Sequence, residues 1–346
     1  MRKAIKRGGM QSAPGTVSST LRRATLAALL AGCAWAAAGP ACAQDPYPSK
    51  PVTILVGFPP GTATDTVARM VGDRLGQRLG QQFIVENKPG AGGSIAAGLG
   101  ARAKADGYTL MIGASAPQAI NPHVYPNLNY DARKDFAPIG LLTWLPYLFV
   151  VSPENPANNL RDFLAAVKAK PGQYTYATTG VGTTSHLVTS VLLSKAGASM
   201  IHVPYKGSSQ AQTDIVGGRT YATFDTMVSS LALVKAGRLK AIAVSTPQRV
   251  ATLPDVPTVS EQGFPGFDMG AWLGLIAPAG IPPDIQQKLA AELNTVLADP
   301  AVRDKLAELG AQVRTTATPA EFGALMKSEY ESWGKVVREF NVKATD

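Results

Sequence analysis

From residue 51 onward the chain alternates short apolar runs with amphipathic stretches. The first run, residues 52–56, reads Val-Thr-Ile-Leu-Val and is followed by a Pro-Pro-Gly turn at residues 59–61. Val67 and Val71 then recur at helical spacing. Regular alternation of strand and helix patterns is typical of βα units, whose strands pair in parallel. The sequence therefore predicts an α/β fold.

The same alternation continues along the chain in two series. Three strands of the first series would bring three loops rich in small residues to one sheet edge, where α/β proteins bind ligands. Thr318 and Glu321 form a capping box at the start of the last helix. Strands are expected at residues 52–56, 83–85, 108–112, 174–178, 199–203, 221–224 and 241–244, with a loop at 113–117. Helices are expected from Thr64-Asp65 to Gly80 and at residues 94–104, 184–196, 208–216, 228–236, 282–297, 300–309 and 319–340.

Two extended apolar segments, residues 140–151 and 270–277, are suited to cross between two lobes. The length of the chain also favours two lobes over a single core. The domains expected are a signal peptide at residues 1–43, a discontinuous first lobe at 44–146 plus 268–346, and a second lobe at 147–267.

The amino-terminal segment has the pattern of a secretory signal. Six basic residues and no acidic one precede Asp45, an apolar run covers residues 24–39, and Ala41-Cys42-Ala43 matches a cleavage site. The apolar run is shorter than the roughly 20 residues that span a bilayer. We expect export and cleavage before Gln44. An alternative stays open, since Leu30-Ala31-Gly32-Cys33 resembles a lipoprotein box that would anchor the chain through Cys33.

Charge and cysteine content restrict the possible partners. The net charge is +9, but without the six basic residues of the leader 27 Lys plus Arg face 24 Asp plus Glu, which is +3. No segment after the leader clusters basic and aromatic residues, so nucleic acid is not expected as a partner. Both cysteines, Cys33 and Cys42, lie in the leader, so the cleaved chain has no disulfide and no thiolate nucleophile.

Motifs of common enzyme classes are missing from the sequence. The three histidines, His123, His186 and His202, form no metal-binding spacing. The chain has no Gly-x-Ser-x-Gly elbow and no Walker lysine loop, and the glycines of residues 90–93 lack the third glycine of a dinucleotide fingerprint. We therefore expect a non-enzymatic protein without catalytic residues, metal or organic cofactor.

Junctions of Gly, Ser and Thr between loops and helices are the sharpest chemical signal. A helix start presents unpaired N–H groups and roughly half a positive charge, so it can bind an anion without a lysine. In residues 179–186 the hydroxyl groups of Thr183, Thr184 and Ser185 add further donors. Two such junctions, one from each lobe, would hold a carboxylate. A single junction taken alone is better explained as an ordinary helix cap.

Several motifs together resemble one transporter family. They are Tyr47-Pro48-Ser49-Lys50-Pro51-Val52, Phe58-Pro59-Pro60-Gly61 with Thr64-Asp65, Asn87-Lys88-Pro89-Gly90-Ala91-Gly92-Gly93, Gly182-Thr183-Thr184-Ser185-His186-Leu187, Val203-Pro204-Tyr205-Lys206-Gly207, and Pro257-Thr258 with Glu261-Gln262-Gly263. In this order they resemble the substrate-binding proteins of tripartite tricarboxylate transporters, the TctC-like or Bug family. The resemblance covers essentially the whole chain after the leader.

The resemblance implies a type II periplasmic-binding fold, two α/β lobes joined by a two-segment hinge. It implies a monomeric periplasmic protein that closes on a small organic acid or acidic amino acid and delivers it to membrane permease subunits. A sensory alternative stays open, in which the loaded protein docks on a membrane histidine kinase.

The resemblance also implies which residues bind the ligand. Two loops, residues 58–65 and 179–186, would hold it from opposite lobes, and three further residues would line the space between them. The ligand-binding residues expected are Phe58, Gly61, Thr62, Thr64, Asp65, Ser115, Thr179, Gly182, Thr183, Thr184, Ser185, His186, Tyr205 and Asp225.

Three of these positions have open alternatives. Thr62 stands where the family usually has a second glycine, and it would either give the ligand a hydroxyl group or narrow the pocket. His186 would bind ligand, or it would cap or pack its helix. Asp225 would recognise an ammonium group of an amino acid, or it would cap the following helix.

Overall fold

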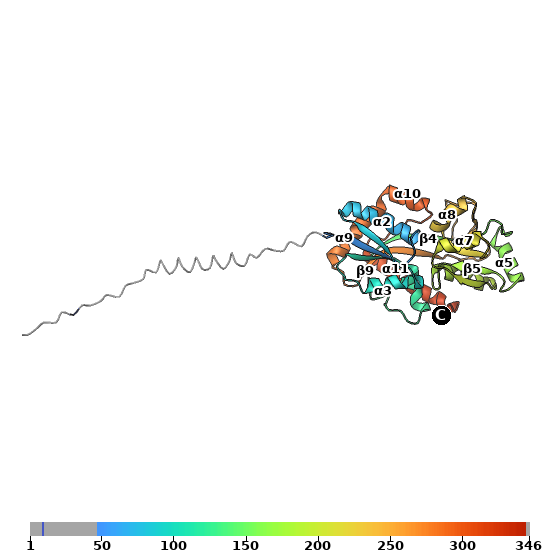
Figure 1. Ribbon diagram of the computed structural model, residues 1–346, viewed down its shortest axis with the longest axis horizontal. Helices are drawn as coiled ribbons and strands as arrows, with labels where there is room; N and C mark the ends of the chain where they lie inside the picture. Colours follow the sequence, from blue (N-terminus) through green and yellow to red (C-terminus); the bar gives the residue numbers. More distant parts are fainter. Residues whose placement is uncertain (1–8, 10–46, 344–346) are drawn as a thin grey trace, which may run out of the picture. The chain divides into compact units, whose positions relative to one another are not determined.

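The computed structural model describes residue 9 and residues 47–343. The predicted signal peptide, its cleavage site and the alternative anchor at Cys33 fall outside these residues. Within the described part, no helix has the length and apolar character needed to cross a membrane. The described strands form one nine-stranded sheet covered by helices (Figure 1).

The first half of the sheet confirms the predicted parallel βα units. Its order is β2-β1-β3, with β1 (Val52–Val56) pairing in parallel with both β2 (Phe83–Asn87) and β3 (Thr109–Ala114). Strand β9 (Gly270–Pro278) then pairs antiparallel with β3. Because β1, β2 and β3 are parallel, the loops that follow them lie at one edge of the sheet.

Strand β4 (Phe136–Val151) joins the two halves of the sheet. It pairs with β9 as far as Pro146, and from Tyr147 onward it pairs with β7 (Ala222–Thr226) and β8 (Lys240–Val244) instead. Strand β7 continues the second half through β5 (Thr175–Thr178) to β6 (Ile201–Pro204), all three parallel. The predicted crossover segments are thus β4 and β9, and the lobe boundaries predicted from the sequence stand as a proposal.

Most helices begin and end close to the residues predicted. Two of them, α6 and α7, have the predicted bounds, and Gly80 ends α2 in the left-handed conformation. The helices are α2 (Ala63–Leu79), α3 (Ser94–Ala101), α4 (Asn121–Val124), α5 (Leu160–Ala169), α6 (Thr184–Ala196), α7 (Ser208–Val216), α8 (Met227–Lys235), α9 (Pro283–Ala298), α10 (Pro300–Glu308) and α11 (Pro319–Glu339), with a 3-10 turn η1 (Ala91–Gly93). Helix α5, capped by Asn159, was not predicted.

One predicted loop is wrong. Residues 113–117 were expected to be irregular, but β3 continues to Ala114 and is followed by a π-helical turn, η2 (Ala116–Ile120). The side chain of Gln118 fixes this turn, because its Oε1 accepts a hydrogen bond from the N–H of Ala114 at 3.1 Å. Turns of this type occur frequently at functional sites.

Aromatic packing stabilises both halves of the sheet. Phe149 on β4 packs edge-on against Phe163 at 4.8 Å and close to Phe224 at 4.9 Å between ring centroids. Trp272 on β9 is fully buried and meets Phe322 at 5.5 Å. Each such buried side chain contributes about 1.5–3 kcal/mol. The crossover strands are therefore held by core packing on both sides of the point where β4 changes partners.

Candidate functional site

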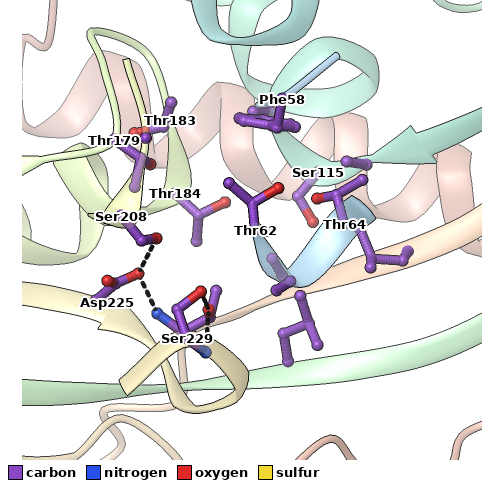
Figure 2. A pocket seen from close by; sticks show the side chains of 18 of the residues that line it. Phe58, Thr62, Thr64, Ser115, Thr179, Thr183, Thr184, Ser208, Asp225 and Ser229 are labelled. Carbon is purple, nitrogen blue, oxygen red and sulfur yellow. Dashed lines mark hydrogen bonds between the residues drawn. The ribbon is translucent and has the colours of Figure 1, made fainter. Parts of the chain in front are cut away.

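A cavity lies where β4 and β9 pass between the two halves of the sheet. Leu145, Tyr147, Ala271 and Leu273 on these strands contribute to its lining. Its volume of about 40 Å³ corresponds to about three water molecules. Figure 2 shows polar side chains from both lobes turned toward this space. The site therefore suits a small solute.

Helix α2 begins at the cavity without a side-chain cap. Its N-cap residue is Thr62, whose hydroxyl group donates to the carbonyl of Pro59 at 2.8 Å. The sequence predicted capping by Thr64-Asp65, but both residues lie inside the helix. The carboxylate of Asp65 accepts from the N–H of Gly61 at 2.9 Å, outside the first turn. The N–H groups of the first turn thus stay without a side-chain partner.

Helix α6 in the second lobe begins with the same turn. Its N-cap Thr183 donates its hydroxyl group to the carbonyl of Gly180 at 2.7 Å and makes no side-chain cap. The backbone matches as well, because the N–H groups of Thr62 and Thr183 each lie 3.4 Å from the carbonyl oxygen three residues earlier. Both turns line the cavity. Two uncapped helix starts therefore present partial positive charge to one space.

Two more helices begin at the cavity, and a carboxylate lies beside their starts. Asp225 Oδ1 accepts from Ser208 Oγ of α7 at 2.8 Å and from the N–H of Thr226, the N-cap of α8, at 2.7 Å (Figure 2). Asp225 Oδ2 accepts from Gln212 Nε2 at 2.8 Å. Asp225 thus places a negative charge beside the starts of α7 and α8, although α7, like α2 and α6, has no side-chain cap. Among the described residues, the starts of α2 and α6 have no such carboxylate bound to their N-cap residues.

Asp225 is the one charged side chain among the described residues that line the cavity. Burial raises the pKa of this carboxyl to about 6, against the lowering effect of its hydrogen bonds from Ser208, Thr226 and Gln212. Within residues 47–343 no Lys or Arg forms an ion pair with it. Since Oδ2 accepts only one of these bonds, Asp225 can still accept a hydrogen bond from a ligand.

The structure brings eight of the fourteen predicted residues to the cavity. The residues that line it are Phe58, Thr62, Thr64, Ser115, Thr179, Thr183, Thr184 and Asp225. The residues that do not line it are Gly61, Asp65, Gly182, Ser185, His186 and Tyr205.

Four of these side chains are engaged elsewhere. Asp65 binds Arg69 and Asn87, and Ser185 Oγ donates to the carbonyl of Phe224 at 2.6 Å. The hydroxyl group of Tyr205 donates to Asp214 at 2.6 Å. The ring of His186 stacks on that of His202, with centroids 4.2 Å apart and planes 6° apart.

The stacking on His202 contributes to the neutral protonation state of His186. Burial, together with the neighbouring His202 ring, lowers the pKa of His186 to about 3, so the ring is neutral near pH 7. Its Nδ1 atom accepts a long hydrogen bond of 3.4 Å from the N–H of Gly182. The geometry favours the packing alternative for His186, with its ring supporting the turn that precedes α6.

Sequence reasoning missed several lining residues. Gly207 and Ser208 start α7, and Thr226 and Ser229 lie in the first turn of α8. Small polar residues at these two predicted helix starts were the signal that could have found them. Tyr147 carried no such signal, because it lies within a long apolar run.

The two lobes touch around the cavity. The hydroxyl group of Tyr125 donates to the carbonyl of Val181 at 2.9 Å. A Cβ atom at Gly207 would lie 3.1 Å from Pro59 Cγ and 3.5 Å from Thr62 Cγ2. Thr62 therefore narrows the space between the lobes with its methyl group, while its hydroxyl group is directed to Pro59.

The family model described as "Tripartite tricarboxylate transporter family receptor" matches residues 67–342. The chain belongs to this family. Protein BugT of Bordetella pertussis is 35% identical over 300 residues, which is 86% of this chain and 92% of BugT. The predicted family is thereby confirmed.

Three solved structures share the fold at more than 30% identity. Periplasmic binding protein BugD is 34% identical with a TM-score of 0.82, over 86% of this chain and 99% of BugD. R. palustris Rpa4515 with adipate is 32% identical with a TM-score of 0.84, over 86% and 99% of the two chains. MatC of Rhodopseudomonas palustris with bound malate is 34% identical with a TM-score of 0.80, over 84% and 100%. The predicted two-lobe binding-protein fold is confirmed.

The buried carboxyl of Asp225 predicts a pH dependence of stability. A pKa raised from 3.8 to about 6 in the folded state gives stability that is complete below about pH 4 and is lost as the pH rises through about 6. The loss amounts to about 3 kcal/mol. The free energy of unfolding of Asp225→Asn, from urea titrations at several pH values, should lack this decline. The exposed Asp304→Asn should keep it, and parallel curves for both variants would contradict the assignment.

Proposed function

We propose that this protein captures a small carboxylate-bearing solute in the cavity between its lobes. The observation that supports the proposal is the pair of uncapped starts of α2 and α6, one from each lobe, at a single cavity. The one carboxylate of the cavity, Asp225, is bound to α7 and α8 and leaves the other two helices open. A ligand carboxylate complements the open pair.

The energetics of this arrangement suit reversible capture. The two open helix starts together offer about one unit of positive charge. Hydrogen bonds to a charged group contribute about 1.5–3 kcal/mol each, from which the costs of association and lobe closure are subtracted. Because only the closed form brings Thr62 and Thr183 to the same ligand, the ligand favours closure. The related structures that hold adipate and malate make dicarboxylates the first candidates.

Asp225 sets a condition on the other end of the ligand. A second ionised carboxylate beside it would be repelled unless one of the two groups is protonated. A hydroxyl or ammonium group could instead donate to the free position on Oδ2. Organic acids with a hydroxyl group and acidic amino acids both satisfy this condition.

Capture without turnover fits the chemistry of the cavity. Its described lining contains no His, Cys or Lys. The hydroxyl groups of Thr62 and Thr183 donate to backbone carbonyls. We propose that the loaded protein is periplasmic after removal of the leader, acts as a monomer, and delivers the solute to the permease subunits of a tripartite tricarboxylate-type transporter.

Direct binding measurements test the ligand class. The temperature of thermal unfolding of the purified protein should rise with a small dicarboxylate such as malate or aspartate, because a ligand that binds only the folded state stabilises it by mass action. The matched amides, in which each carboxylate is neutral, should give no shift. A larger shift with the amides than with the acids would refute the proposal.

Delivery to a transporter is tested separately, by deletion of the neighbouring permease, which should abolish uptake of the bound acid.

Lobe closure is tested by a single methyl group at Gly207. The backbone there is extended, with φ of 180°, so alanine fits the local conformation. Its Cβ would however press on Pro59 across the cavity. Overpacking of about 1 kcal/mol predicts that Gly207→Ala binds the best acid about fivefold more weakly, with little change in the stability of the free protein.

The control is Gly217→Ala at the other end of α7, whose nearest neighbours are Thr213 and Arg219 of its own lobe. Calorimetric titration should give this variant the affinity of the unmodified protein. Equal affinities for both variants would show that closure over Gly207 is not part of binding.

A further inference from the structure

A second cavity, of about 270 Å³, lies beside η2 and α11. None of its described lining residues lines the first cavity. Its walls include Phe136 and Pro138 of β4 and Met326 of α11, and Arg133 and Lys327 contribute positive charge. The size is close to the lower end of the range for small-molecule sites.

Gln118, which lines this cavity, carries a buried hydrogen-bond donor without a partner among the described residues. Gln118 is 3% exposed, and its Oε1 accepts from the N–H of Ala114. That bond fixes the orientation of the amide, since only the oxygen can accept. Among residues 47–343 no acceptor lies within hydrogen-bond distance of Gln118 Nε2. A buried donor without a partner costs about 1–3 kcal/mol, so the site favours any occupant that brings an acceptor.

The charged side chains that line this cavity are all positive. Arg133 and Lys327 are the charged residues in its described lining, and no carboxylate is among them. Arg133 lies 5.2 Å from the centroid of the Tyr330 ring and 3.6 Å from the carboxylate of Asp131, which stands outside the lining. Lys327 forms no ion pair within the described part of the chain. An anion is therefore the complementary occupant.

The remaining walls are apolar. Phe136 and Ala132 are buried to more than nine-tenths and belong to the same hydrophobic cluster as Trp272. Met326, a flexible side chain that adapts to ligand shape, packs against this cluster. An inorganic anion would leave these walls uncovered, whereas an acid with an apolar body would cover them.

We propose that this cavity is a second binding site, for a small amphipathic monocarboxylate. The carboxylate accepts a hydrogen bond from Gln118 Nε2 and is balanced by Arg133 and Lys327, and the apolar body packs on Phe136 and Met326. The site lies close to the first one along the chain, because Ala114, Ser115 and Ala116 line the first cavity and Gln118 holds Ala114. Its occupation is a separate event from solute capture.

A fluorinated probe tests the proposal. Titration of the purified protein with 4-fluorobenzoate should show binding in the ¹⁹F NMR signal of the probe. The methyl signal of Met326 should shift in ¹H–¹³C spectra of the same samples. The surface double variant Arg133→Gln with Lys327→Gln should weaken binding about fivefold or more, because two charge-assisted contacts are lost. Gln118→Met, which keeps the volume and removes the donor, should also weaken it. Lys335→Gln, an exposed charge elsewhere on α11, is the matched control.

The outcomes are distinct. Absence of binding in the millimolar range, or binding that the double variant leaves unchanged, overturns the proposal. Binding that malate or adipate displaces and that Gly207→Ala weakens would place the probe in the first cavity and would also overturn it. The result does not depend on the solute of the first cavity, since thermal shifts with dicarboxylates are measured separately.

Discussion

The proposed capture of an anion depends on two threonine hydroxyl groups that do not cap the helices they precede. Thr62 and Thr183 occupy N-cap positions but donate to the carbonyl three residues earlier. Capping by a threonine ordinarily contributes about 0.5–2 kcal/mol, and α11 is capped in this way by Thr318. Local rules of this kind are broken mainly where function requires it. Here both exceptions leave amide groups free at the same cavity.

The rest of the site follows from the placement of one negative charge. Asp225 receives bonds from Ser208 Oγ and from the N–H of Thr226, so a negative charge already stands beside the starts of α7 and α8. The cavity is thus divided into an acceptor side at Asp225 and a donor side at Thr62 and Thr183. Such a division orients a ligand with two different ends, which four equivalent helix starts could not do.

Sequence patterns predicted the elements better than the directions of their side chains. Helix α6 has the predicted bounds, but only its first residues line the cavity, because helical periodicity turns Ser185 and His186 toward the interior. The stack of His186 on His202 joins a helix to a strand, and the contact of Gly207 with Pro59 joins the two lobes. These are long-range relations that no local pattern contains. The π-helical turn η2 was also missed, although the bond that holds it, from the N–H of Ala114 to Gln118 Oε1, is local.

The joint between the lobes is a ribbon of paired backbone. Strands β4 and β9 stay hydrogen-bonded to each other up to the pair of Pro146 and Gly270, with irregular register near Pro138 and Leu141. Such irregularities increase the local twist of a strand. In the proposed closure, the change of angle between the lobes would be distributed over many successive dihedral angles of these two strands. Amino-acid changes along β4 and β9 would therefore alter the angle between the lobes, while the loops that line the cavity on either side keep their shape.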